Sequence, residues 1–113
     1  MIKRGDVFLA KLDTAQGAAT NGELPVIVMS RDAINKSSPI IIVVPVTGRE
    51  NKKTIYPSHV ILKAGEGGLT KESVALGEQV RAINTARFIK QLGHLAPHSV
   101  TAVGVALKIA LDL

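Results

Sequence analysis

Residues 25–47 read PVIVMSRDAINKSSPIIIVVPVT, and this stretch decides the class of fold. It holds two runs of mainly β-branched residues, 25–30 and 39–46, and each run begins with a proline, where a missing backbone N–H harms a strand least. Continuous apolar runs of this kind are typical of strands that are buried on both faces. The polar segment between them, residues 31–38, predicts a turn or a single turn of helix.

Other segments of the chain also have the composition of strands. We expect these further strands at residues 5–12, 58–63, 73–83 and 86–95. The long strand 73–83 is expected to break at Gly77, in the form of a bulge, and the last of the four reads as a turn followed by a short strand. Segments rich in glycine or charge predict loops at residues 13–23, 48–54 and 64–72.

The end of the chain predicts a helix that begins at Pro97, a favourable first helical residue. One helical face carries Val100, Val103, Leu107 and Leu111, and another carries Val105 and Ile109. A surface helix needs only one apolar stripe, so we expect this helix to be covered on two sides, by the sheet and by a second subunit. The pattern as a whole predicts a mainly β (α+β) fold, with a strongly bent sheet or half-open barrel capped by the helix.

Composition narrows the possible functions of the chain. We predict one domain over residues 1–113, and the absence of cysteine excludes disulfides and thiolate metal sites. The net charge of +5 favours an acidic or polyanionic partner. With only three aromatic residues, a nucleic acid would have to be held by phosphate and hydrogen-bond contacts. The charged N-terminal segment and the short apolar runs predict neither a signal peptide nor a membrane span, and hence a cytoplasmic protein.

The histidines and glycines do not form a recognisable catalytic or metal motif. His59, His94 and His98 lack the spacing of metal ligands, so we interpret them as structural, and we predict no metal and no cofactor. The stretch AGEGG, residues 64–68, lacks the pattern of a phosphate loop and reads as a turn.

Thr47 stands at the end of the second buried run, directly before a basic segment. Arg49, Lys52 and Lys53 follow it, and a hydroxyl beside such a segment is a suitable place to hold a phosphate. The alternative is that Thr47 caps a turn and that the basic segment is a solvated hairpin tip.

Residues 77–83, GEQVRAI, place three polar side chains inside a predicted strand. Glu78, Gln79 and Arg81 cannot all belong to a core, so they either line a groove or face solvent at a sheet edge. Gln and Arg side chains can read base edges or hold phosphates.

Taken together, these segments resemble the MazF/PemK/Kid family of toxins from type II toxin–antitoxin modules. The resemblance is carried, in order, by KRGDVFLAKLD, PVIVMSRDAINKSSP, IIVVPVT, SHVIL, SVALGEQVRAI and the apolar C-terminal helix. It covers nearly the whole chain. It implies an SH3-like, CcdB/MazF-type small β-barrel with a C-terminal helix, which forms a homodimer.

The resemblance also implies an activity and a partner. Family members are metal-independent endoribonucleases that cut single-stranded mRNA at short motifs. The 2′-OH of the substrate attacks the phosphate, and a 2′,3′-cyclic phosphate and a 5′-hydroxyl result. The cognate MazE-like antitoxin carries an acidic C-terminal tail that enters the RNA groove. Because the nucleophile belongs to the substrate, the enzyme has to move protons and stabilise charge on phosphorus.

The family's catalytic pair is only half present in this sequence. In the family an Arg directly before a Pro at the start of the second strand works with the strand-end Thr. Thr47 matches the Thr, but Leu24 occupies the Arg position and is not itself catalytic. Ala19 and Thr20 likewise stand where Glu and Gln are common. The residues that we expect to contact RNA are Thr47, Arg49, Lys52, Lys53, Ser73, Glu78, Gln79 and Arg81.

Leu24 leaves three explanations open. The protein is a degenerate or repurposed toxin, or a deliberately inactivated one, or another cation substitutes, with Arg81, Arg49 and Arg31 as candidates. The alternative function is that of a binding protein without nuclease activity. Such a protein would hold gyrase, as the related poison CcdB does, or RNA, or would serve only to bind antitoxin.

Overall fold

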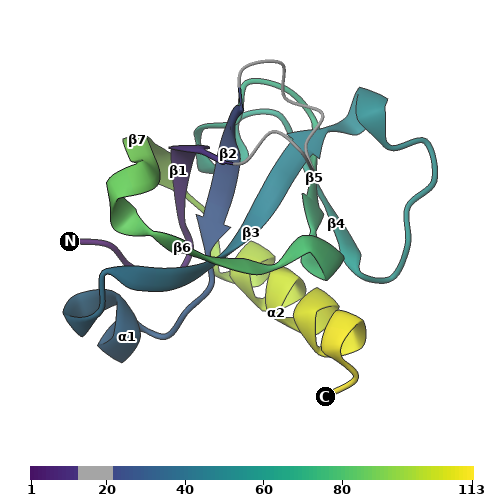
Figure 1. The fold of residues 1–113 in the computed structure, drawn as a ribbon. Coiled ribbons are helices and arrows are strands. Elements are labelled where there is room, and N and C mark those ends of the chain that lie inside the picture. The colour runs from purple at the N-terminus through teal and green to yellow at the C-terminus, as the bar shows by residue number, and fades with distance from the viewer. Residues whose placement is uncertain (13–21) are drawn as a thin grey trace.

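The computed structural model describes residues 1–12 and 22–113. Its strands are β1 Asp6–Lys11, β2 Glu23–Val28, β3 Ile40–Gly48, β4 His59–Leu62, β5 Ser73–Leu76, β6 Arg81–Asn84 and β7 Phe88–His94. The helices are α1 Asp32–Ser37 and α2 Pro97–Leu111, and the single-turn helices are η2 Arg49–Asn51, η3 Glu66–Gly68, η4 Gly77–Gln79 and η5 Thr85–Arg87. Figure 1 shows α2 lying against one side of a strongly bent sheet. Ala19 and Thr20 lie outside the described residues.

The strands pair antiparallel in the order β4-β5-β3-β2-β1-β7, and β6 also pairs with β3. The predicted α+β class is therefore confirmed. Among the described strands the path stays open between β4 and β7, as in the half-open barrel that the strand pattern predicts. The turn between β4 and β5 packs against β7 instead, so closely that a Cβ on Gly68 would lie 2.0 Å from the carbonyl oxygen of Leu92.

The strand predicted over residues 73–83 breaks at Gly77, as expected, but the break is the single-turn helix η4 and not a bulge. η4 interrupts it, so that β5 pairs with the C-terminal half of β3 and β6 with the N-terminal half. The break occurs where the backbone of Gly77 meets two other segments. A Cβ on Gly77 would lie 2.6 Å from the carbonyl oxygen of Ser58 and 3.4 Å from the backbone of Ala106 in α2. Gly77 therefore serves a close approach of three segments and is not a bulge.

Burial on both faces holds for only part of β3. Val43 and Val44 are fully buried, but Ile40 and Ile42 are 46% and 40% exposed, so the prediction is wrong for the first half of this strand. The reason is the position of α2, which packs mainly against β4 and η4 and leaves the start of β3 uncovered.

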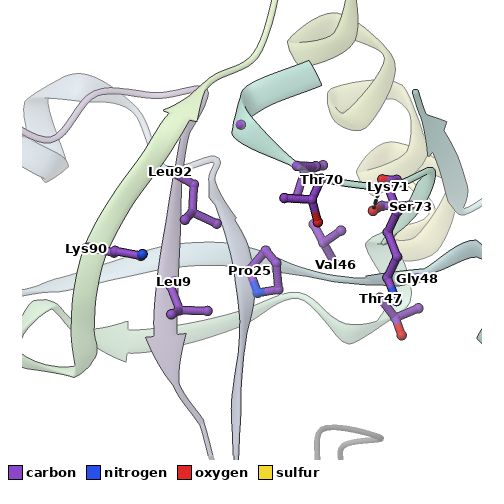
Figure 2. Close-up of a pocket in the computed structure, with 12 residues that line it drawn as sticks. Leu9, Pro25, Val46, Thr47, Gly48, Thr70, Lys71, Ser73, Lys90 and Leu92 are labelled. Atoms are coloured by element: carbon purple, nitrogen blue, oxygen red, sulfur yellow. Dashed lines mark hydrogen bonds between the residues drawn. The ribbon is translucent and has the colours of Figure 1, made fainter. Parts of the chain in front are cut away.

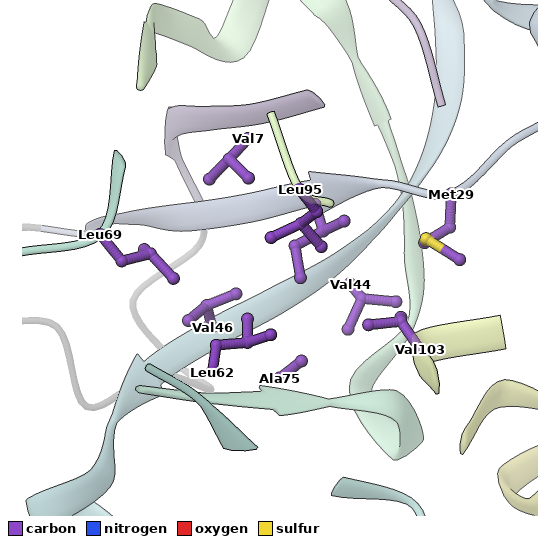
Figure 3. Packing of buried hydrophobic residues seen from close by; sticks show 10 residues of the cluster. Val7, Met29, Val44, Val46, Leu62, Leu69, Ala75, Leu95 and Val103 are labelled. Atoms are coloured by element: carbon purple, nitrogen blue, oxygen red, sulfur yellow. The ribbon is translucent and has the colours of Figure 1, made fainter. Parts of the chain in front are cut away.

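Two apolar clusters occupy opposite faces of the bent sheet. The first lies between the sheet and α2 and includes Val7, Val44, Leu95 and Val103 (Figure 3). The second lies on the other face and consists of Ala10, Leu12, Val26, Val28, Ile41, Val43 and Ile83, with Ile2, Phe8, Leu24 and Phe88 packed against it. Alternation along β1 contributes to both clusters, because Val7 enters the first cluster whereas Phe8 and Ala10 lie with the second.

The helix α2 is covered on one side, as predicted. It buries Ser99, Val103 and Ala106, whereas Val105 and Ile109 stay about half exposed, at 51% and 50%. None of the residues that the structure describes covers this second side of α2. No helix among them is long and apolar enough to cross a membrane.

The remaining element predictions agree with the structure with small shifts. Residues 31–38 contain the short helix α1, and residues 86–95 contain the end of η5 followed by β7. β7 has seven residues, so this strand is longer than predicted.

Candidate functional site

β2 and β3 lie side by side only over part of their lengths. Their pairing runs from Val28 opposite Val43 to Val26 opposite Pro45. Beyond that point β2 continues along β1 and β3 continues along β5, so the two strands part. Pro25 begins the divergence on β2, where its ring nitrogen offers no hydrogen for a ladder bond. We call the parted segments, residues 23–25 and 46–48, the fork.

The fork carries Leu24 on one arm and Thr47 on the other. Each lies two residues beyond the last pair, Val26 and Pro45, and alternation along the strands places their side chains on the sheet face of the second cluster. In Figure 2 the Thr47 side chain points away from the space between the arms. The structure thus brings the two positions that sequence reasoning paired to the same end of the sheet.

The Thr47 hydroxyl is held by a residue that the sequence did not single out. The side-chain amide of Asn51, at the end of η2, donates a hydrogen bond of 3.0 Å to the Thr47 oxygen. Because the Thr47 oxygen accepts here, its own proton remains available for a different acceptor. The one sequence signal for Asn51 was its place in a polar turn four residues after Thr47.

The basic segment after Thr47 is folded back on itself. One guanidinium nitrogen of Arg49 donates to the backbone carbonyl of Lys52, and Lys53 is exposed. The carboxylate of Glu50 pairs with the ammonium of Lys71. That hydrogen bond holds the pKa of the exposed Glu50 carboxyl below its ordinary value, so Glu50 stays ionised and offsets Lys71. Arg49, Lys52 and Lys53 supply the positive charge beside Thr47.

Leu24 is part of an apolar row across three strands. It lies opposite Ala10 on β1, and Ala10 lies opposite Phe88 on β7. Phe88 stacks on Phe8 with ring centroids 4.3 Å apart and planes 6° apart. Leu24 is half-buried against this group, so it contributes packing and neither a proton nor a charge.

Three arginines were candidates to supply the cation that the family resemblance leads us to expect at position 24, and the fold separates them. Arg49 is two residues from Thr47. Arg81 lies opposite Val43, four residues along β3 from Thr47 or about 13 Å at the usual rise of a strand. Arg31 immediately precedes α1, beyond the opposite end of β2 from Leu24. Arg49 is therefore the candidate nearest to Thr47 in the structure.

Glu78 is bonded to the scaffold. Its carboxylate accepts hydrogen bonds from Ser58, at 3.1 Å, and from Nε2 of buried His59, at 2.9 Å. Nδ1 of His59 accepts from the backbone N–H of Tyr56, so Nε2 carries the ring proton. Partial burial alone would raise the pKa of Glu78, but the hydrogen bonds from His59, the backbone and Ser58 hold it below its ordinary value. The structural interpretation of His59 is confirmed.

The other expected RNA contacts divide between two regions. Gln79, the last residue of η4, is exposed, and Arg81, the first residue of β6, is half-buried; both lie away from the fork. Ser73 pairs with Gly48 near the fork, but it is 4% exposed and its hydroxyl donates to the carbonyl of Lys71. Thr47, Arg49, Lys52 and Lys53 thus share one region, whereas Glu78, Gln79 and Arg81 share another.

A cavity of about 300 Å³ opens between the arms of the fork (Figure 2). Its apolar lining comes from Leu9, Pro25, Val46, Leu69 and Leu92. Its polar lining comes from Thr47, Gly48, Gly68, Thr70, Lys71, Ser73 and Lys90. Sequence reasoning missed this cavity because its walls come from five segments that are far apart along the chain.

The remaining histidines take structural or exposed positions. His94 bonds the buried carboxylate of Asp6 through Nδ1 at 2.6 Å, and Asp6 also accepts the backbone N–H of Lys3. His98 is exposed in the first turn of α2. Within residues 1–12 and 22–113, no group of three or more His, Asp or Glu side chains is placed to hold a metal ion.

Comparison with known proteins identifies a matching family and several solved structures with a similar fold. The model of the PemK-like, MazF-like toxins of type II toxin–antitoxin systems matches residues 3–111. A similar solved structure is an endoribonuclease in complex with its cognate antitoxin from a Mycobacterial species. Its TM-score is 0.80 at 20% identity, and the likeness covers 100% of this chain and 97% of that one.

Two other solved structures are similar to the same extent. The Mycobacterium tuberculosis toxin MazF-mt6 has a TM-score of 0.79 at 22% identity, over 96% of this chain and 97% of that one. MazF from Deinococcus radiodurans has a TM-score of 0.79 at 23% identity, over 99% of this chain and 97% of that one. These likenesses show the fold.

Proposed function

Because this chain belongs to the PemK-like, MazF-like toxin family of type II toxin–antitoxin systems, we propose that it is an endoribonuclease that cuts single-stranded mRNA without a metal or cofactor. The observation that carries the proposal is the Thr47 hydroxyl on the fork, held by Asn51 with its proton available. Arg49, Lys52 and Lys53 supply the charge that a phosphodiester needs.

The reaction uses the nucleophile of the substrate. The 2′-oxygen loses its proton and bonds to phosphorus, the bond from phosphorus to the 5′-oxygen breaks, and the 5′-oxygen takes up a proton. The products are a 2′,3′-cyclic phosphate and a 5′-hydroxyl. The Thr47 hydroxyl donates to a non-bridging phosphate oxygen, where negative charge grows in the transition state. Arg49 is the cation nearest to that position.

Leu24 sets the expected rate. An arginine at this position would place a permanent cation on the second arm of the fork, whereas the leucine places an uncharged, apolar side chain there. Removing one group that stabilises transition-state charge costs about 10²–10³ in rate. The chain therefore binds RNA and cuts it slowly.

The test compares the unmodified chain with Leu24→Arg on a mixed-sequence RNA, with and without chelator. Cuts are read by primer extension and the product ends by their phosphate chemistry. We expect Leu24→Arg to cut roughly 10²–10³-fold faster, with no effect of chelator. Leu24→Gln is the control, since it is polar without charge. Equal rates for all three chains would show that position 24 does not belong to the catalytic site.

We further propose that the protein acts as a homodimer in the cytoplasm, and that an acidic antitoxin tail inhibits it. The half-exposed Val105 and Ile109 on α2 support the dimer, because large apolar side chains gathered on one helix face mark an interface. The net charge of +5 supports an acidic partner. One of the similar structures is itself a complex with its cognate antitoxin.

A second candidate is a binding protein without nuclease activity, comparable to the gyrase poison CcdB. Leu24 is the observation that favours it, because the half-buried leucine packs well where a cation would be needed for chemistry. This candidate predicts no RNA cuts from either the unmodified chain or Leu24→Arg, together with retained binding to a protein target.

A further inference from the structure

We propose that Gly48, Glu50 and Lys71 form a latch that holds the basic turn, residues 49–53, in place beside Thr47, and that this latch raises the rate of RNA cleavage. The effect on cleavage rests on the proposed function, whereas the ordering of the turn does not. Glu50 and Lys71 act through the turn and not on the phosphate, so they are positioning residues.

The basic turn carries the groups that we propose to act on RNA. Arg49 at its start is the candidate cation nearest to Thr47, and Asn51 donates a hydrogen bond to the Thr47 hydroxyl. A backbone hydrogen bond of 3.0 Å from the N–H of Lys52 to the carbonyl of Arg49 closes the turn. A single helical turn is not stable by itself in water, so the position of Asn51 depends on what holds the turn to the rest of the chain.

The turn is joined to the segment before β5 by a backbone link and by a side-chain link. The backbone N–H of Arg49 donates to the carbonyl of Glu72 at 3.0 Å, which fixes the start of the turn. The ammonium of Lys71 donates to the carboxylate of Glu50 at 2.5 Å, which fixes its middle. The backbone link alone would let the rest of the turn pivot about Arg49. We therefore assign the orientation of Asn51 to the ion pair.

Gly48 makes room for the ion pair. A Cβ on Gly48 would lie 2.3 Å and 2.6 Å from the two carboxylate oxygens of Glu50, so this carboxylate occupies the space that a side chain would fill. The backbone of Gly48 has φ −66° and ψ 146°, a conformation open to any residue. The missing side chain, and not backbone freedom, therefore lets Glu50 reach back to Lys71, which extends toward Gly48 in Figure 2.

The exposure of the ion pair limits its expected effect. The side chains of Lys71 and Glu50 are 63% and 57% exposed, and ion pairs of this kind contribute little energy. The hydrogen bond from Lys71 holds the pKa of Glu50 below its ordinary value, so the pair stays charged in neutral solution. We therefore expect the latch to change the rate by about three- to fivefold, which is less than the effect of a group that touches the phosphate.

The main test is Glu50→Gln in the Leu24→Arg background. Attraction alone predicts that the loss of a negative charge beside the phosphate site lowers KM and leaves kcat unharmed. The latch predicts instead that kcat falls about three- to fivefold. Glu72→Gln is the matched control, because it removes the same charge from an exposed neighbour of Lys71 and keeps the carbonyl that accepts from Arg49. Its kcat should change less than about twofold.

Further variants test each part of the latch. Lys71→Met removes the charge at similar length and should lower kcat as much as Glu50→Gln does, whereas Lys71→Arg should retain it. The double variant Glu50→Gln, Lys71→Met should lose no more than either single variant, because both changes break the same bond. Gly48→Ala should lower kcat by the same factor, since its Cβ displaces the carboxylate. In a chain that already carries Glu50→Ala, it should add less than about twofold.

A measurement without RNA tests the ordering of the turn separately from catalysis. Backbone amide order parameters of residues 49–51 are measured by NMR relaxation on the full-length protein. They should be about 0.85 in the unmodified chain and fall below about 0.6 in Glu50→Gln and in Lys71→Met. Glu72→Gln should leave them unchanged.

The outcomes separate the latch from the proposed nuclease. Unchanged order parameters in Glu50→Gln and Lys71→Met would overturn the latch, whatever the RNA assays show. Additive losses of kcat in the double variant, or equal losses in Glu72→Gln and Glu50→Gln, would overturn it as well. If the order parameters fall but kcat does not, the turn is ordered by the pair without a gain in rate, and the proposal fails. If no chain with Leu24→Arg cuts RNA, the proposed nuclease fails, and only the ordering of the turn stands.

Discussion

Asn51 donates a hydrogen bond of 3.0 Å to the hydroxyl oxygen of Thr47, across the single turn that follows β3. A side-chain amide N–H can only donate, so the direction of this bond is unambiguous once the nitrogen is assigned. The bond restricts the rotation of the Thr47 side chain and leaves its proton for an external acceptor. In the proposed reaction that acceptor is a phosphate oxygen.

The Asn51–Thr47 bond leads to a prediction about rate. In the Leu24→Arg background, Asn51→Ala should lower kcat about tenfold, because Thr47 loses its fixed orientation. Asn51→Asp should lower it further, because a carboxylate would accept the hydrogen bond that the Thr47 hydroxyl gives to phosphate, and would repel the phosphate. kcat and KM are measured on a short RNA, and thermal unfolding serves as the control for stability. Unchanged kcat in Asn51→Ala would exclude this role.

The basic turn leads to a prediction about salt. Single-stranded RNA affinity falls with salt at a slope of roughly 0.7 per phosphate neutralised. Lys52→Ala and Lys53→Ala should each reduce the slope by about that amount, measured by fluorescence anisotropy between low and moderate salt. Lys108→Ala, on exposed α2, is the matched control and should leave the slope unchanged. If Lys108→Ala reduced the salt slope as much as Lys52→Ala and Lys53→Ala, RNA would be attracted by the overall charge of the protein and not by the basic turn.

Glu78 leads to a prediction about stability and pH. Partial burial acts to raise the pKa of Glu78 in the folded state. Hydrogen bonds from His59, the backbone and Ser58 outweigh this effect and hold the pKa below its ordinary value. A carboxyl group whose pKa is lower in the folded than in the unfolded chain stabilises the fold at pH values above its ordinary pKa of 4.5. This stabilisation is lost as the pH falls through the pKa of the folded state.

The measurement compares urea unfolding of the unmodified chain and Glu78→Gln between neutral pH and about pH 3. The variant should be less stable at neutral pH by only about 0.5 kcal/mol, because the Glu78 side chain is 42% exposed and solvent screens it. The difference should shrink in acid. Glu72→Gln, at an exposed position, controls for charge. A difference that grows in acid would contradict the pKa direction.

The uncovered side of α2 leads to a prediction about assembly. The double variant Val105→Glu, Ile109→Glu should be a folded monomer at low micromolar concentration, because two charges replace the half-exposed apolar side chains. The unmodified chain and Lys108→Glu, which adds a negative charge to the same helix, should sediment as dimers. A folded monomer of the unmodified chain under these conditions would contradict the dimer.

The local pattern of the sequence was sufficient for much of the fold. The pattern of residues 5–12 predicted the strand β1, and the run after Pro97 predicted α2 and its second apolar side. The end of β3 at Gly48 placed Thr47 at a strand end before a basic turn. These features depend on the periods of strands and helices, which are properties of neighbouring residues.

Contacts between distant segments decided the rest. Gly77 predicted a break in the strand over residues 73–83, but its cause, the approach of the backbones of Ser58 and Ala106 to Gly77, depends on segments far away in the sequence. The contacts of Glu78 are of the same kind, because His59 and Ser58, which hold its carboxylate, lie about twenty residues earlier in the sequence.

The sequence by itself determined that a leucine, Leu24, stands where the family resemblance leads us to expect a catalytic arginine. The tertiary structure decided what surrounds it: β2 and β3 part after Val26 and Pro45, and a cavity opens between Leu24's arm of the fork and that of Thr47. The sequence states directly which residue stands at each position. The divergence of β2 and β3, in contrast, arises because β2 continues along β1 and β3 continues along β5, and these pairings join segments that are far apart in the sequence.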